Sequence, residues 1–231
     1  MDLTITPTKL HGAVTPPPSK SQAHRLLIAA ALSGGVSTIH NLADSQDIAA
    51  TRRCLAALGA RIDELGENTV QVHGLGNAVV EAGPAPILDC GESGSTLRFL
   101  IPLALLVNGE AAFTGHGRLM ERPLKPYEDL FREKGIAWKW ENGRLTVDGG
   151  RGYGDYVLDP GEYRLPGNVS SQFFTGLLFV LPLLDGDSTL VPTTPLESRD
   201  YLELTRQVQA LAGVRSRWQG EALFIPGGQR Y

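Results

Sequence analysis

The sequence predicts an α/β fold made of three copies of one unit, which runs helix, strand, helix, strand, strand. Three segments share a polar start, an amphipathic helix, a glycine that ends it and two strand-like runs around a turn. The helix-ending glycines, Gly59, Gly135 and Gly213, recur at nearly equal intervals. An almost wholly apolar helix precedes each segment, as expected of a buried helix. We therefore expect pseudo-threefold symmetry over roughly residues 17–226, with the helices buried inside sheets.

The first unit begins with SKSQAHRLLIAAALSGG, which predicts a buried helix, and continues with the strand-like run STIHNL. The second helix of the unit lies in SQDIAATRRCLAALG, and ARIDELGENTVQV predicts two strands around a turn. Asp44 and Asp47 stand at the start of that second helix. We expect one of them to cap the helix, which argues against a pair of catalytic carboxylates.

The second and third units repeat this order. Their buried helices are predicted in SGSTLRFLIPLALLVNGE and NVSSQFFTGLLFVLPLLDGD, and the strand-like runs AAFTG and STLVP follow. The amphipathic helices lie in ERPLKPYEDLFREKG and ESRDYLELTRQVQALAG, and the hairpins in IAWKWENGRLTV and VRSRWQGEALFI. A leading strand is expected before each buried helix. Trp138, Trp140 and Trp218 fall in the hairpins, where we expect them to pack.

The starts of the three buried helices predict a binding site for an anion. They read Ser19-Lys20-Ser21, Ser93-Gly94-Ser95 and Val169-Ser170-Ser171. A helix start offers free backbone N–H groups and a partial positive charge, and Lys20 and Arg25 add cations to the first of them. Threefold symmetry would direct all three starts toward one region, where a phosphate or carboxylate could bind. The alternative is that the serines only cap their helices and the cations are solvated.

Composition limits the function classes. The chain has 231 residues, is 42% hydrophobic and carries a formal charge of −4, which argues against broad binding of nucleic acid or an anionic membrane. Two distant cysteines, Cys54 and Cys90, form no metal motif or disulfide framework, and fit a reducing cytoplasm. The start of the chain has no signal-peptide character, and the longest apolar stretch is too short to span a membrane. No metal-ligand spacing is seen among the histidines, His11, His24, His40, His73 and His116, and we expect His24 to be a surface or core residue.

Five motifs in fixed order carry a family resemblance: PSKSQAHR, LDCGESGSTLRF, GRLMERPLKPYEDL, PGNVSSQFFTGLL and ESRDY. Together, on a threefold repeat, they resemble the 5-enolpyruvylshikimate-3-phosphate synthase family over nearly the whole chain. That family implies six units in two domains, of which three are counted here. The chain therefore resembles the N-terminal half. We expect residues 1–15 to hold an opening strand of the other domain, residues 16–227 to form the three-unit domain, and residues 228–231 to begin the crossover.

The resemblance implies transfer of the enolpyruvyl group of phosphoenolpyruvate to the 5-hydroxyl of shikimate 3-phosphate, without a metal or organic cofactor. Lys20 matches the family's lysine between the two substrates and is our candidate catalytic residue. Gly94 and Arg122 match a glycine and an arginine beside phosphoenolpyruvate, and Gln172 matches a glutamine that touches both substrates. The residues that match contacts to shikimate 3-phosphate are Ser21, Arg25, Ser170, Ser171, Ser198 and Tyr201.

Other interpretations stay open at this point. Ser198 and Tyr201 could be a helix cap and a packed ring, and Arg98 is expected to be a structural cation near the site. The related enzyme that acts on UDP-N-acetylglucosamine has a cysteine in the loop before its arginine, and GHGRLMERP has none. The family's proton-transfer carboxylates lie in the half that is not represented here, so we expect the chain alone to be inactive or nearly so. A non-catalytic anion-binding or interaction module is the alternative function.

Overall fold

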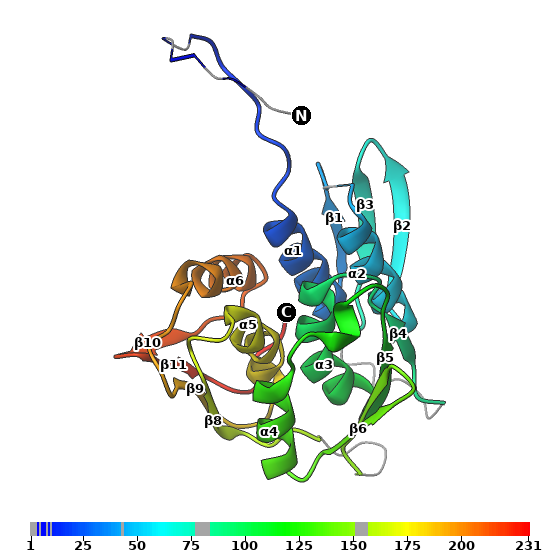
Figure 1. The fold of residues 1–231 in the computed structure, drawn as a ribbon, viewed down its shortest axis with the longest axis vertical. Helices are drawn as coiled ribbons and strands as arrows, with labels where there is room; N and C mark the ends of the chain where they lie inside the picture. The colour runs from blue at the N-terminus through cyan, green and yellow to red at the C-terminus, as the bar shows by residue number, and fades with distance from the viewer. Residues whose placement is uncertain are drawn as a thin grey trace.

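The computed structural model describes residues 4, 6, 7, 9, 11–42, 44–76, 84–150 and 157–231. Three units follow one another along the described chain, as predicted (Figure 1). The first unit consists of α1 (Lys20–Leu32), β1 (Val36–Ile39), α2 (Gln46–Ala57), β2 (Arg61–Gly66) and β3 (Thr69–His73).

The second and third units have the same order with a leading strand added, and each contains one short 3-10 helix. The second unit consists of β4 (Ile87–Asp89), α3 (Gly94–Asn108), β5 (Glu110–Thr114), η1 (Leu119–Glu121), α4 (Lys125–Glu133), β6 (Ala137–Glu141) and β7 (Arg144–Asp148). The third unit consists of β8 (Gly161–Leu165), α5 (Ser171–Val180), η2 (Leu181–Leu183), β9 (Ser188–Pro192), α6 (Arg199–Leu211), β10 (Arg217–Gln219) and β11 (Ala222–Ile225).

Each unit forms its own sheet. The strand orders are β1-β3-β2, β4-β5-β7-β6 and β8-β9-β11-β10. The leading strands pair in parallel, β4 with β5 and β8 with β9, and the remaining pairs are antiparallel. In the first sheet β1 is an edge strand among the described residues. The opening strand expected within residues 1–15 falls largely outside the described residues, and the described Thr4, Thr6 and Pro7 are not in a strand.

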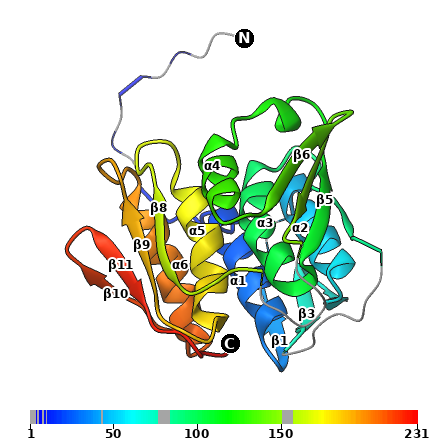
Figure 2. The ribbon, with the colours of Figure 1, turned by 90° about the horizontal axis from the view of Figure 1, so that it is seen from below.

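Three central helices form the core. In Figures 1 and 2, α1, α3 and α5 lie between the sheets, which confirms the prediction that buried helices are enclosed by sheets. Ten of the fifteen residues of α3 and nine of the ten of α5 are buried, and one continuous apolar cluster joins all three units. The second helix of each unit, α2, α4 or α6, carries a polar face toward solvent. None of the helices in the described part of the chain is long and apolar enough to cross a membrane.

Two backbone features let α3 and α5 approach closely. Pro102 lies inside α3 and has no N–H to donate to the carbonyl oxygen of Arg98, one turn earlier. Gly176 of α5 faces that carbonyl, and a Cβ on Gly176 would lie 2.6 Å from Arg98 O and 2.3 Å from Tyr127 Oη. The hydroxyl of Tyr127 donates a 2.7 Å hydrogen bond to Phe173 O of α5. A side chain at position 176 would therefore force the two helices apart.

The end of the chain packs against the third unit. The N–H groups of Gly228 and Gln229 donate to Leu184 O and Pro182 O, at 2.6 and 2.9 Å. The hydroxyl of Tyr231 donates to Phe179 O at 2.9 Å and accepts from Gln209 Nε2 at 2.7 Å. Residues 228–231 are thus tied to the three-unit body in this structure.

Candidate functional site

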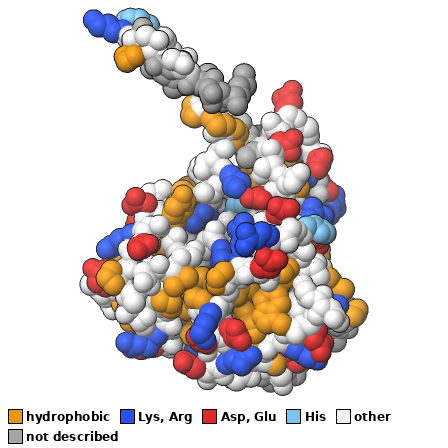
Figure 3. Space-filling view, in the orientation of Figure 1, with side chains coloured by type: hydrophobic (Ala, Val, Ile, Leu, Met, Phe, Trp, Pro, Cys, Tyr) orange, Lys and Arg blue, Asp and Glu red, His pale blue; other side chains and the backbone are white. Residues whose placement is uncertain are grey.

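One pocket lies where the three buried helices begin. Its volume is about 390 Å³, and first-turn residues of α1, α3 and α5 line it together with the start of α6. Figure 3 shows Lys and Arg side chains gathered near the middle of one face of the molecule, beside a broad apolar area. Of the predicted site residues, eight line this pocket: Lys20, Ser21, Arg25, Ser170, Ser171, Gln172, Ser198 and Tyr201.

The buried helices start with serine caps and without acidic residues. Ser19, Ser93 and Ser170 each accept a hydrogen bond from a backbone N–H of the first turn. The first turns of α1, α3 and α5 contain no Asp or Glu, whereas α2, α4 and α6 each carry one. A helix start without an acidic side chain keeps its partial positive charge available to a ligand. The three central helices therefore direct positive potential toward one pocket.

Arg25 is a buried cation in the wall of this pocket, with 2% of its surface exposed. Its guanidinium donates to Thr205 Oγ1 at 2.8 Å, to Ser21 O at 2.7 Å and to Tyr201 O at 3.1 Å. All these acceptors are neutral, and within the described chain no carboxylate pairs with Arg25. Burial lowers the pKa of Arg25 to about 10, because desolvation disfavours the charged form. The Arg25 guanidinium therefore remains charged at neutral pH, and an anionic ligand would complete its pairing.

Lys20 stands at the mouth of the pocket and is half exposed. Its Nζ lies 2.7 Å from Asp47 Oδ2 of α2, in an ion pair with both partners open to water. An exposed pair of this kind contributes at most about 1 kcal/mol. The ammonium can therefore exchange Asp47 for a ligand anion at little cost.

Gln172 connects the pocket to a second cationic region. Its Oε1 accepts a 2.6 Å hydrogen bond from Arg98 Nη1, and its Nε2 donates to Ser95 Oγ at 2.9 Å. These bonds fix the orientation of the Gln172 amide between α3 and α5. Arg98 is therefore held beside the site by a protein side chain.

Gly94 and Arg122 lie beside that second region and outside the lining of the first pocket. A Cβ on Gly94 would lie 2.8 Å from Arg122 Nη1 and 3.3 Å from Arg98 Nη1. The pKa of Arg98 is lowered, first by burial and then by the charge of Arg122. Two guanidinium groups held close together are suited to share a phosphate or carboxylate. The ten predicted residues thus fall into two adjoining groups, linked by Arg98 and Gln172.

The family model for EPSP synthase (3-phosphoshikimate 1-carboxyvinyltransferase) matches residues 5–230. The chain belongs to the EPSP synthase family. A 3-phosphoshikimate 1-carboxyvinyltransferase of Clostridium kluyveri is 48% identical over 232 residues, which cover 99% of this chain and 52% of the relative. The enzyme of the same name from Clostridium beijerinckii is 46% identical, and the match covers 100% of this chain and 53% of the relative.

Solved structures lead to the same family. An EPSP synthase from Acinetobacter baumannii superposes with a TM-score of 0.75 at 25% identity, covering 95% of this chain and 47% of that one. The chain spans about half the length of the curated relatives it matches. The matches thus confirm the fold class and agree with the expectation that the chain corresponds to one half of an EPSP synthase.

The sequence prediction for the N-cap of α2, in the first unit of this EPSP-synthase half, is wrong. Neither Asp44 nor Asp47 caps α2: the hydroxyl of Ser45 accepts the hydrogen bond from Ile48 N, at 3.3 Å. Asp47 instead forms the ion pair with Lys20 of α1. The serine between the two expected candidates therefore caps α2, and the Asp47 carboxylate is left to the contact with α1.

Ser198 and Tyr201 also differ from the simpler interpretation. Ser198 occupies the N-cap position of α6 with a left-handed φ of 59°, and its side chain makes no capping hydrogen bond. Tyr201 is 47% exposed, and its ring centroid lies 5.7 Å from Arg25 Cζ. Both residues face the pocket, so they are available to a ligand.

Sequence reasoning missed two polar residues of the lining, Ser95 and Glu197. Ser95 belongs to the predicted helix start Ser93-Gly94-Ser95, so symmetry with Ser21 and Ser171 could have identified it. Glu197 is exposed beside Ser198 and no pattern marks it. Its carboxylate adds one negative charge to a lining whose other charged side chains are Lys20 and Arg25.

We expected His24 to be either a surface or a core residue, and it is a core residue with 1% of its surface exposed. Its Nδ1 lies 2.7 Å from Thr51 Oγ1, and burial lowers its pKa to about 4. The imidazole is therefore neutral and does not add to the charge of the site. Among the described residues no cluster of three His, Cys, Asp or Glu side chains could hold a metal ion.

Proposed function

We propose that this chain is the half of an EPSP synthase that binds shikimate 3-phosphate, within an enzyme that transfers the enolpyruvyl group of phosphoenolpyruvate to the 5-hydroxyl. The observation that carries this proposal is Arg25, a buried cation without a carboxylate partner, in a pocket where three helix starts meet. Desolvating a charge is costly unless it is paired, so such a group is expected where an anionic ligand completes the pairing.

Shikimate 3-phosphate would place its phosphate at the start of α5. There the first-turn N–H groups and the hydroxyls of Ser170 and Ser171 supply donors, and Arg25 and Ser21 supply the charge and further donors. Ser198 and Tyr201 would contact the sugar-like ring from α6. Each of these groups already faces the same volume.

Phosphoenolpyruvate would lie beside Gly94 and Arg122. The absent side chain at Gly94 leaves room next to Arg122 Nη1, and the guanidinium fork fits a carboxylate or phosphate. Gln172 bonds Arg98 and so links the two groups of residues, and Lys20 lines the first of them. Lys20 would contact both anions and stabilise the charge that develops when the 5-hydroxyl adds to C2 of phosphoenolpyruvate, before phosphate is eliminated.

We infer that a second half, corresponding to the other half of the relatives, completes the active site in the cytoplasm. Residues 16–227 would form the substrate domain, and residues 1–15 and 228–231 would lead to the other domain. Groups that transfer protons in the family lie in that other half. We therefore expect the 231-residue chain alone to bind shikimate 3-phosphate weakly and to show little or no turnover.

The test is calorimetric titration of the chain with shikimate 3-phosphate and, separately, with inorganic phosphate. We expect saturable binding of one shikimate 3-phosphate per chain, at least about tenfold tighter than phosphate. Lys20→Ala should weaken this binding by about tenfold. The matched control is Asp47→Asn, which breaks the same ion pair and leaves the cation free, so binding should be unchanged or tighter.

Equal affinity for phosphate and shikimate 3-phosphate would overturn the assignment and favour the alternative of a non-catalytic anion-binding module. So would equal loss in Lys20→Ala and Asp47→Asn, because the ion pair and not the cation would then matter. A phosphate-release assay with both substrates measures turnover. Rates for the pure chain comparable with a full-length relative would contradict the need for a second half.

A further inference from the structure

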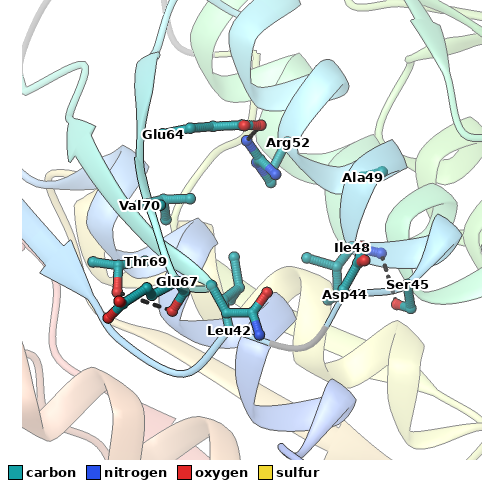
Figure 4. Close-up of a pocket in the computed structure, with 12 residues that line it drawn as sticks. Leu42, Asp44, Ser45, Ile48, Ala49, Arg52, Glu64, Glu67, Thr69 and Val70 are labelled. Atoms are coloured by element: carbon teal, nitrogen blue, oxygen red, sulfur yellow. Dashed lines mark hydrogen bonds and ion pairs between the residues drawn. The ribbon is translucent and has the colours of Figure 1, made fainter.

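A second cavity lies inside the first unit, between α2 and the hairpin of β2 and β3. Its volume is about 300 Å³, and it shares no lining residue with the anion pocket. Figure 4 shows the side chains arranged around a hollow centre, with Ile48 and Ala49 on the α2 side and Glu64 and Val70 on the hairpin side. A volume of this size accommodates a small ligand.

The third unit shows what fills the corresponding place there. In its hairpin, Trp218 pairs with Leu223, and in the second unit Trp140 pairs with Leu145. The same position of the first hairpin, opposite Val70, is Glu64. Each pair lies next to the one that closes the turn, so the three positions are equivalent. The first unit therefore has a carboxylate where the other two have an indole.

Trp218 is held by two residues of α6. Arg199 lies over the indole, with 3.9 Å from Cζ to the ring centroid, and the indole Nε1 donates to Glu203. Counted back from the glycines that end the two helices, Arg199 and Glu203 correspond to Ser45 and Ala49 of α2. Relative to the third unit, the first unit thus lacks an aromatic ring, a cation and a carboxylate at one place.

Arg52 shows the consequence of these replacements. Its counterpart Arg206 donates through Nε to Ser216 Oγ at 3.1 Å and pairs with Glu203. Arg52 instead pairs with Glu64, and its buried Nε has no hydrogen-bond partner among the described residues. Glu64 therefore supplies the carboxylate that position 49 lacks. The ring and the cation are still missing.

The charges that line the cavity determine which ligand could take the place of the missing ring and cation. Three acidic side chains line the cavity, Asp44, Glu64 and Glu67, against a single cation, Arg52. The apolar wall consists of Leu42, Ile48, Ala49 and Val70. This combination favours a flat apolar ring that carries positive charge and N–H donors, and it disfavours an anion.

We propose that the cavity of the first unit binds a small aromatic amine, whose ring takes the place of the Trp218 indole and whose ammonium takes the place of the Arg199 guanidinium. The ring would lie over Ala49 and the largely buried Ile48 and Val70, and the ammonium would bind the carboxylates of Asp44 and Glu64. A ligand here is independent of the anion pocket, because the two sites share no residue and select opposite charge.

The test is a calorimetric titration of the 231-residue chain with a series that keeps the indole ring and changes the charge: tryptamine, indole and indole-3-propionate. We expect tryptamine to bind saturably at one site per chain, indole about tenfold more weakly, and indole-3-propionate not measurably. Added salt should reduce the difference between tryptamine and indole, since the cavity is open to solvent.

Two variants of Glu64 distinguish the effect of filling the cavity from the effect of removing the carboxylate charge. Glu64→Trp installs the residue of the other two units and should abolish tryptamine binding, and Glu64→Gln keeps the cavity and should weaken binding roughly threefold to tenfold. The Glu64 side chain is 73% exposed, so neither change should impair folding, which circular dichroism verifies. Glu141→Trp, in the hairpin of the second unit, is the matched control and should bind normally.

Binding of indole-3-propionate as tight as that of tryptamine would overturn the proposal. So would tryptamine binding that survives in Glu64→Trp or is lost in Glu141→Trp, or the absence of saturable tryptamine binding to the unaltered chain.

Discussion

The anion pocket and the cavity of the first unit arise from the same repeat in opposite ways. The anion pocket uses what the units share: a serine-capped, acid-free start of a buried helix, brought to one place by threefold symmetry. The cavity of the first unit exists where the units differ, because Glu64 replaces the indole found in the other hairpins. Features that all three units share thus produce a cationic site between the units. A residue that differs in one unit, Glu64, produces an acidic site within that unit.

The largest expected effect comes from removing Arg25. Arg25→Met should weaken shikimate 3-phosphate binding at least about 100-fold, close to 3 kcal/mol, measured by calorimetry. The free energy of unfolding should fall by no more than about 1 kcal/mol. Thr205, one of its acceptors, itself donates to Tyr201 O at 2.8 Å, and the substitution removes a desolvated charge.

Arg25→Met should still bind tryptamine normally, because the two sites share no residue. A large loss of stability in urea unfolding, with a parallel loss at both sites, would show that Arg25 is a structural residue. Arg25→Lys keeps the charge and changes the geometry, so it should recover only part of the binding.

A second effect is the pH dependence of stability set by His24. The folded state holds the pKa of His24 at about 4, below its ordinary value of 6.5, because the ring is buried. The unfolded chain therefore binds more protons between these values, and stability that is present above pH 6.5 is lost as the pH falls toward 4. We expect this group to contribute a loss of about 2 kcal/mol, seen as a drop in urea midpoint.

The control is His24→Asn, which keeps a hydrogen-bonding group near Thr51 and does not titrate. Its stability should change less between pH 6.5 and 4.5 than that of the unaltered chain. An equal pH dependence in both would assign the effect to other groups. A neutral His24 also leaves Lys20 and Arg25 as the cations of the anion pocket at pH 7.

The smallest expected effect concerns the packing that brings the helix starts together. Gly176→Ala would place a methyl group 2.6 Å from Arg98 O and should lower the free energy of unfolding by about 1–2 kcal/mol. The shift of α5 against α3 should also weaken shikimate 3-phosphate binding, and tryptamine binding should be unchanged. Unchanged stability and binding together would show that the close approach of the two helices is not needed.

Much of the fold could be predicted because the helix patterns, the helix-ending glycines and the turn residues all indicate the same repeated unit. Apolar helices, amphipathic helices, stopping glycines and turn residues recur three times, so an error in one unit is corrected by the others. The convergence of the helix starts follows from that symmetry alone. The eight site residues that line one pocket were instead implied by the family resemblance.

Features outside the repeat could not be predicted in this way. The pairing of Lys20 with Asp47 and the neutral surroundings of Arg25 depend on contacts between helices far apart in the chain. The replacement of an indole by Glu64 is visible in the sequence, since Glu64, Trp140 and Trp218 each stand five residues after Gly59, Gly135 and Gly213, but only the structure shows a cavity beside Glu64.

The most direct test of the account asks whether three helix starts bind one ligand. Backbone amide resonances of the chain would be followed by NMR during titration with shikimate 3-phosphate. If the three starts converge on one ligand, the amides of Ser21, Ser95 and Ser171 should shift together with one binding constant, while that of Glu128, at the start of α4, stays in place. Shifts confined to a single helix start, or different binding constants for the three, would contradict the central claim.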